Sequence, residues 1–136
     1  MAFVMLNPST ADERRDDPTI RRCVGFARRW GFGGVEIVNL FALRASDPRA
    51  LRRASDPVGP DNDRHIARVT ARAALLVVAW GVWGRLRGRS AALGARLSRR
   101  APRCLGLTRS GEPRHPLYLR ADARLVPARS ARRSSA

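Results

Sequence analysis

Polar residues that could do chemistry follow the first apolar segment of the chain. Residues 3–6 are apolar and predict a short buried strand. Four polar residues come soon after it: Asn7, Ser9, Thr10 and Asp12. Pro8 keeps Asn7 out of helical geometry, and open α/β sheets bind ligands at the carboxyl ends of their strands. We therefore expect a binding site here; the alternative is a tight turn whose side chains satisfy only their own backbone.

A second asparagine closes the next predicted strand. Residues 35–41 are rich in β-branched side chains and bring Asn39 close to the end of that strand. Because the carboxyl ends of parallel strands meet at one edge of a sheet, we expect Asn7 and Asn39 on the same rim. Asn62 stands where a later helix is predicted to begin and is a further candidate for this rim.

Two more strands complete the predicted sheet. Residues 75–81 are apolar on both faces, as in a central strand, and end at Trp80 and Gly81, where glycine permits a ligand to come close. Residues 103–108 predict the fourth strand. The loop after it is broken by Gly and Pro and carries His115 near its tip, which adds a titratable side chain to the same edge.

Helical periodicity predicts the elements between these strands. The first helix follows an acidic cap at Asp16 and Asp17, has Pro18 in its first turn and ends at Gly31. Its expected apolar face comprises Ile20, Cys23, Val24 and Ala27. A short helix within 48–53, one with apolar residues at 66, 69 and 73, and one over 83–97 follow. This order predicts an α/β fold: a three-layer α/β/α sandwich with a mostly parallel, roughly four-stranded sheet.

Length and composition favour one domain over residues 1–123. From Arg124 onwards Arg, Ser and Ala dominate without periodicity, so residues 124–136 are predicted to be a disordered tail. The first strand begins almost at the first residue, which raises the question of a missing N-terminal strand or hairpin. No apolar run could span a membrane and no secretory signal is visible, so we expect a cytoplasmic protein. We also expect a monomer, with Cys23 and Cys104 as buried thiols in apolar surroundings.

The positive charge is concentrated in one half of the chain. The net charge is +16; residues 1–63 hold ten Arg and nine acidic residues, whereas residues 64–136 hold seventeen Arg and two acidic residues. Such a surface attracts polyanions. We expect nucleic-acid contacts from Arg85, Arg89 and Arg114. A solvated helix face, or the Arg bias of a GC-rich genome, is the alternative explanation.

Six motifs carry a family resemblance. They are LNPSTAD (6–12), DPTIRR (17–22), NLF (39–41), PVGPDN (57–62), AWG (79–81) and GEPRHPL (111–117). Together they resemble a bacterial and phage family known only as domain of unknown function 1643. This resemblance covers most of the chain but implies no activity.

A second resemblance does imply one. The Asn-Pro after the first strand, the Asn closing the second, the glycine after the third and the His-Pro after the fourth are similar to the uracil-DNA glycosylase superfamily. This likeness implies a glycosylase-like fold in which Asn7 orients a water, Asn39 reads a flipped base and His115 supports the departing base. Phe41 or Trp80 would stack on that base, with core packing as the alternative for both.

The expected function is recognition of a nucleobase or nucleotide in nucleic acid, without a cofactor. The resemblance makes N-glycosidic hydrolysis the candidate reaction, with Asn7 and His115 as catalytic residues. The expected binding residues are Ser9, Thr10, Asp12, Asn39, Phe41, Asn62, Trp80 and Gly81. One alternative is a non-catalytic DNA- or RNA-binding module that acts through the Arg-rich half. Another is a hydrolase or transferase for a small nucleotide-like substrate, with Asp12 or Asp17 as acid, base or metal ligand.

Overall fold

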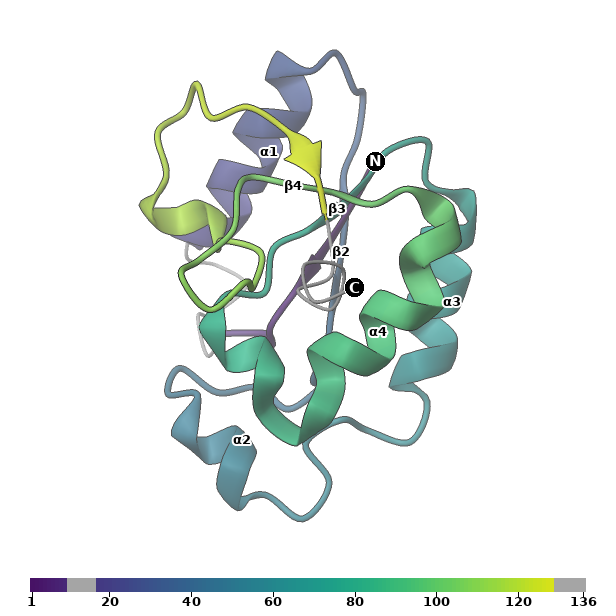
Figure 1. Ribbon diagram of the computed structural model, residues 1–136, viewed down its shortest axis with the longest axis vertical. Helices are drawn as coiled ribbons and strands as arrows, with labels where there is room; N and C mark the ends of the chain where they lie inside the picture. The colour runs from purple at the N-terminus through teal and green to yellow at the C-terminus, as the bar shows by residue number, and fades with distance from the viewer. Residues whose placement is uncertain (10–16, 129–136) are drawn as a thin grey trace.

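A five-stranded sheet runs through the centre of the molecule (Figure 1). The computed structural model describes residues 1–9 and 17–128. The strands are β1 (Ala2–Met5), β2 (Glu36–Asn39), β3 (Leu76–Val78), β4 (Arg103–Cys104) and β5 (Val126–Pro127). Their order is β2-β1-β3-β4-β5, and only β5 runs antiparallel to its neighbour. The prediction of a mixed α/β fold with a mostly parallel sheet is confirmed.

Strand β1 is central in the sheet, with β2 paired to one edge and β3 to the other, and all four of its residues are buried. Val4 packs into the core on one face, whereas Phe3 and Met5 pack into the core on the opposite face. This alternation is the period of two expected for a strand, and the apolar character of both faces is typical of a covered parallel sheet.

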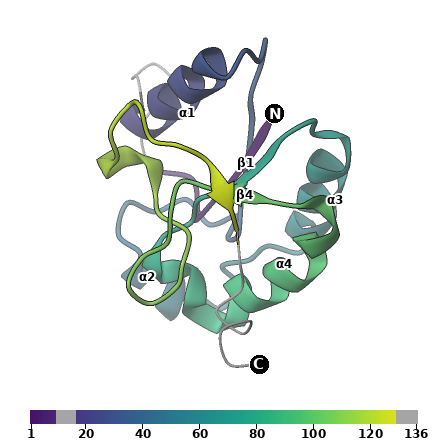
Figure 2. The same ribbon diagram turned by 45° about the horizontal axis from the view of Figure 1, so that its top comes forward.

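Helices cover both faces of the sheet (Figure 2). Helix α1 (Pro18–Arg29) packs Cys23 and Phe26 against the face that holds Phe3. Helices α3 (Asn62–Arg72) and α4 (Arg89–Leu97) pack on the other face. The short helix α2 (Arg49–Arg53) lies between β2 and α3 in the sequence, within the predicted range 48–53.

The start of α1 was predicted correctly. Asp17 is its N-cap and accepts a hydrogen bond from the Thr19 amide, with Pro18 in the first turn. The predicted apolar face is shifted, because Phe26 is buried with Cys23 whereas Ile20 is exposed. The side chain of Ile20 therefore remains available at the surface.

The continuous helix predicted over 83–97 is wrong. A 3₁₀ helix, η1 (Val82–Gly88), precedes α4, and near the end of η1 the backbone of Leu86 and Arg87 is not helical. Arg87 has φ of 55°, and its guanidinium donates to the carbonyls of Arg52 and Ala54. The apolar spacing continues across this break, which is why periodicity alone joined the two segments.

The C-terminal prediction also needs correction. Val126–Pro127 forms β5 and pairs with β4, so the sheet has five strands rather than four and these residues are not a disordered tail. The Ala128 amide continues this attachment by donating to the Pro102 carbonyl. Backbone hydrogen bonds to β4 and to Pro102 hold this short segment, and Ala128 also packs against the core. The rest of the predicted tail, 129–136, lies outside the described residues.

Two further 3₁₀ turns are η2 (Ser98–Arg100) after α4 and η3 (Pro116–Tyr118) after the loop with His115. In the described residues no helix is long and apolar enough to cross a membrane.

Candidate functional site

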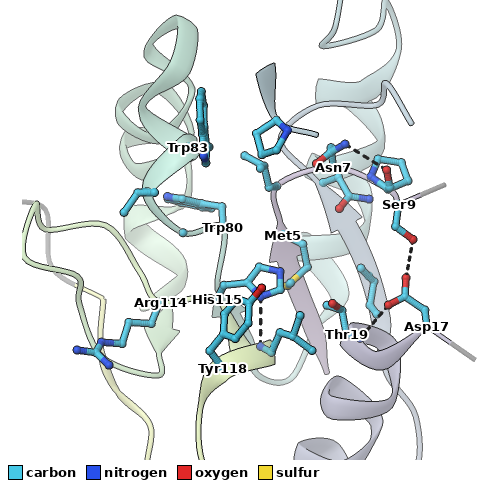
Figure 3. A pocket seen from close by; sticks show the side chains of 18 of the residues that line it. Met5, Asn7, Ser9, Asp17, Thr19, Trp80, Trp83, Arg114, His115 and Tyr118 are labelled. Carbon is cyan, nitrogen blue, oxygen red and sulfur yellow. Dashed lines mark hydrogen bonds between the residues drawn. The ribbon is translucent and has the colours of Figure 1, made fainter. Parts of the chain in front are cut away.

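A pocket of about 1180 Å³ opens where β1, β2 and β3 end (Figure 3). Residues 5–9 and Asn39 form one part of its wall, and residues 80–83 form another. The first turn of α1 and residues within 44–48, 108–109 and 114–119 also line it. The structure thus brings together seven of the predicted site residues: Asn7, Ser9, Asn39, Trp80, Gly81, Arg114 and His115.

Asn7 connects the end of β1 to the loop that follows β2. Its Nδ2 lies within hydrogen-bond distance of three carbonyl oxygens, those of Pro8 at 3.1 Å, Leu43 at 3.1 Å and Ala45 at 2.9 Å. Because three acceptors surround one end of the amide, that end is the nitrogen. Among the described residues the hydrogen bonds of this side chain all involve Nδ2, and Asn7 lines the pocket.

His115 is held in one tautomer. Its Nδ1 accepts a hydrogen bond from the Leu117 amide at 3.2 Å, so the neutral ring carries its proton on Nε2. Burial lowers the pKa of His115 below the usual 6.5, and the negative charge of Asp17 only partly offsets this. At neutral pH the ring is therefore mainly uncharged and offers an N–H donor.

Both carboxylate oxygens of Asp17 accept hydrogen bonds from within the protein. Its Oδ1 accepts from the Thr19 amide and its Oδ2 accepts from Ser9 Oγ, both at 2.8 Å. Burial raises the pKa of Asp17, but hydrogen bonds from Ser9, Thr19 and Ile20 outweigh it and hold the pKa below its usual range. The carboxylate is a weak base that joins the start of α1 to residue 9. The other two acids of the predicted cluster, Asp12 and Asp16, and also Thr10, lie outside the described residues.

Glu112 supports the wall of the pocket, a role that was not predicted from the sequence. This buried carboxyl accepts from Trp80 Nε1 and from Ser90 Oγ, each at 2.8 Å. It therefore joins the segment that carries His115 to the pocket wall and to α4. Gly84 supports the same arrangement, because a Cβ there would lie only 2.0 Å from Cδ1 of Trp80. The only signal in the sequence was a Glu inside the GEPRHPL motif.

Four predicted site residues lie away from the pocket: Phe41, Asn62, Arg85 and Arg89. Phe41 is fully buried in the core that α3 and α4 cover. Asn62 donates from Nδ2 to the carbonyls of Asn39 and Leu40 at 2.8 and 3.1 Å. Arg89 is only 7% exposed and donates to the Leu40 carbonyl and to Asp63. Core packing holds the Phe41 side chain, and hydrogen bonds within the protein hold those of Asn62 and Arg89, so these three side chains have a structural role in the fold.

Arginines give the pocket a positive charge. Four line it, namely Arg21, Arg44, Arg109 and Arg114, against the single carboxylate of Asp17 among the described lining residues. Arg44 donates to the Ser9 carbonyl at 2.6 Å, and Arg114 donates to the Leu107 carbonyl at 3.2 Å. Such a charge distribution attracts an anionic ligand. Only Arg114 of these four was predicted from the sequence, whereas Arg85 is exposed but does not line the pocket.

Part of the Arg excess has a structural role. Like Arg87, Arg100 donates to a backbone carbonyl, that of Ala71, at 3.0 Å. Arg72 forms an exposed ion pair with Glu36. Within the described ranges no three His, Cys, Asp or Glu residues come together in a group that could hold a metal ion.

The fold and site define an α/β protein with a cationic pocket at the carboxyl edge of a mostly parallel sheet. The chain belongs to the family described as "Protein of unknown function (DUF1643)", whose model matches residues 1–117. That match includes Asn7, Asn39 and His115, and it confirms the first resemblance. Neither the comparison with curated proteins nor the search of solved structures found a match, and the likeness to uracil-DNA glycosylases stays a prediction.

Two substitutions, Glu112→Ala and Glu112→Gln, test whether the hydrogen bonds of Glu112 stabilise the fold. Glu112→Ala leaves the buried indole N–H of Trp80 without its acceptor, so the free energy of unfolding should fall by about 1–3 kcal/mol. Glu112→Gln should lose less, because an amide can accept from Trp80 and donate to Ser90. Urea unfolding followed by tryptophan fluorescence measures both. Equal losses for the two variants would contradict this account.

Stability should depend on pH through His115. Because its pKa is lower in the folded than in the unfolded protein, the unfolded chain binds more protons as pH falls through about 6.5, and stability decreases. His115→Asn keeps an acceptor for the Leu117 amide but does not titrate. Between pH 7.5 and about 5.5, this variant should lose less stability than the parent in urea unfolding.

The matched control for this pH experiment is His65→Asn, since His65 is an exposed histidine on α3. It removes one histidine without touching the pocket and so tests whether the change of slope is specific to His115. A slope that is unchanged in His115→Asn would show that burial of His115 is not its source.

Proposed function

We propose that this protein binds a nucleobase of a nucleic-acid strand in the pocket and hydrolyses its N-glycosidic bond. The observation that carries the proposal is the pairing of two complementary groups in one cavity. Asn7 offers an amide oxygen as acceptor, and neutral His115 offers its Nε2–H as donor. The first suits a water molecule and the second suits a carbonyl oxygen of a base.

The reaction would follow from these two groups. A water held by Oδ1 of Asn7 attacks C1′ of the sugar, and the bond from C1′ to the base nitrogen breaks. The electron pair of that bond leaves with the base, and His115 donates a hydrogen bond to the carbonyl oxygen where the negative charge accumulates. The proton lost by the water passes to the departing base or to solvent. An amide is a weak base, so this scheme requires most of the bond breaking to precede attack.

Asn39 and the arginines supply recognition. Asn39 is the last residue of β2, pairs in register with Met5 and lines the pocket. An amide both donates and accepts, which matches the edge of a nucleobase. The four lining arginines would contact phosphates, since guanidinium groups form charge-assisted hydrogen bonds to them.

The alternatives have less support. Asp17 in a hydrolase or transferase would serve as acid, base or metal ligand, yet both its oxygens accept structural hydrogen bonds and its pKa is lowered. A module acting through the Arg-rich half would need free guanidinium groups, yet Arg87, Arg89 and Arg100 donate to backbone carbonyls. The pocket, rather than the overall charge, is therefore the basis of the proposal.

The test is cleavage of labelled single- and double-stranded oligonucleotides that carry uracil, hypoxanthine or a mismatch. The parent should produce abasic sites, and Asn7→Ala and His115→Ala should each reduce the rate by about 100-fold or more. His65→Ala is the matched control and should retain the parent's rate. Circular dichroism checks that each variant is folded. Absence of abasic product from every substrate, with binding intact, would refute hydrolysis and leave a binding module.

A further inference from the structure

Exposed apolar side chains gather at the pocket. Five large apolar side chains of the described residues are exposed, and three of these line it: Ile20 (41% exposed), Val82 (52%) and Tyr118 (87%). They come from the start of α1, from η1 and from η3. Figure 3 shows Tyr118 next to His115, and their ring centroids are 6.5 Å apart. Exposed apolar groups concentrated at one cavity indicate an interaction surface.

The backbone around Tyr118 is fixed, although its ring is exposed. Pro116 before it is buried, and the Leu119 amide after it donates to the Pro116 carbonyl at 3.2 Å. Leu119 also packs against the core beneath α1, and its carbonyl accepts a hydrogen bond from Arg22 of α1. An aromatic ring on such a turn binds a partner with little loss of conformational entropy.

Cations surround this apolar group. Arg21, Arg109 and Arg114 are exposed and line the same pocket. Charge and apolar surface together match a nucleic-acid strand whose phosphates and base faces are both accessible. In a duplex the base faces are stacked on one another, so the Tyr118 ring would have no flat partner there. The combination favours an unpaired strand.

Building on the proposed function, we infer that the substrate is single-stranded and that Tyr118 stacks on the base next to the one in the pocket. Ile20 and Val82 would contact neighbouring sugar and base surfaces, and the exposed arginines would contact the phosphates. Stacking on an aromatic ring tolerates any base, because every base has a flat π-face. The protein should therefore bind the flanking base without discriminating among the four bases.

The test places the fluorescent base 2-aminopurine beside the target nucleotide of a single-stranded oligonucleotide. Stacking on Tyr118 should quench its emission when the protein binds. Tyr118→Ala should abolish this quenching and weaken binding by roughly 5- to 150-fold, the range for loss of one base–aromatic stack. Tyr118→Phe keeps the ring and should behave as the parent. Val126→Ala, an exposed apolar residue of β5, is the control for loss of surface area.

The outcomes separate this inference from the proposed function. Binding and quenching that persist in Tyr118→Ala, or a duplex that binds as tightly as the single strand, would overturn the stacking inference alone. Failure of the parent to bind any oligonucleotide would overturn the proposed function together with it. Since the Tyr118 side chain is almost fully exposed, Tyr118→Ala should keep the parent's thermal stability. Unchanged stability would show that a loss of binding comes from the missing ring and not from unfolding.

Discussion

The position of β1 between two parallel neighbours is the constraint on which the rest of the structure depends. Its pairing places Met5 opposite Asn39 on one side and Val4 opposite Val78 on the other. The three strands therefore end at one level, and the chain after each must turn there. The amide of Asn7 then ties the turn after β1 to the loop after β2. The pocket is the space that these turns leave open.

Strand ends could be predicted from sequence because the signal is local. A short apolar run that stops at Asn-Pro, and another that stops at Trp-Gly, place Asn7 and Gly81 at strand ends without knowledge of the partners. The break in front of α4 and the pairing of β5 could not be predicted this way. The first depends on Arg87 reaching the carbonyls near α2, and the second on pairing between distant segments.

The candidate site was harder to predict than the fold. A polar residue that lines a pocket and one that only satisfies buried backbone groups cannot be told apart by residue type. Asn39 lines the pocket, whereas Asn62 donates to the carbonyls of Asn39 and Leu40. Arg114 lies at the pocket and Arg89 is buried against Leu40 and Asp63. Buried polar groups require hydrogen-bond partners. Side chains that the sequence alone suggests are available to a ligand therefore donate to backbone carbonyls at strand ends.

The central claim is that neutral His115 offers its Nε2–H to a base in the pocket. The most direct test is a ¹H–¹⁵N spectrum of the imidazole at neutral pH, during titration with single-stranded oligonucleotides carrying uracil or hypoxanthine. The account predicts the Nε2–H tautomer and a shift of the Nε2–H resonance on binding, with the signals of His65 unchanged. A protonated ring, the Nδ1–H tautomer, or a His115 signal that does not respond to either oligonucleotide would contradict it.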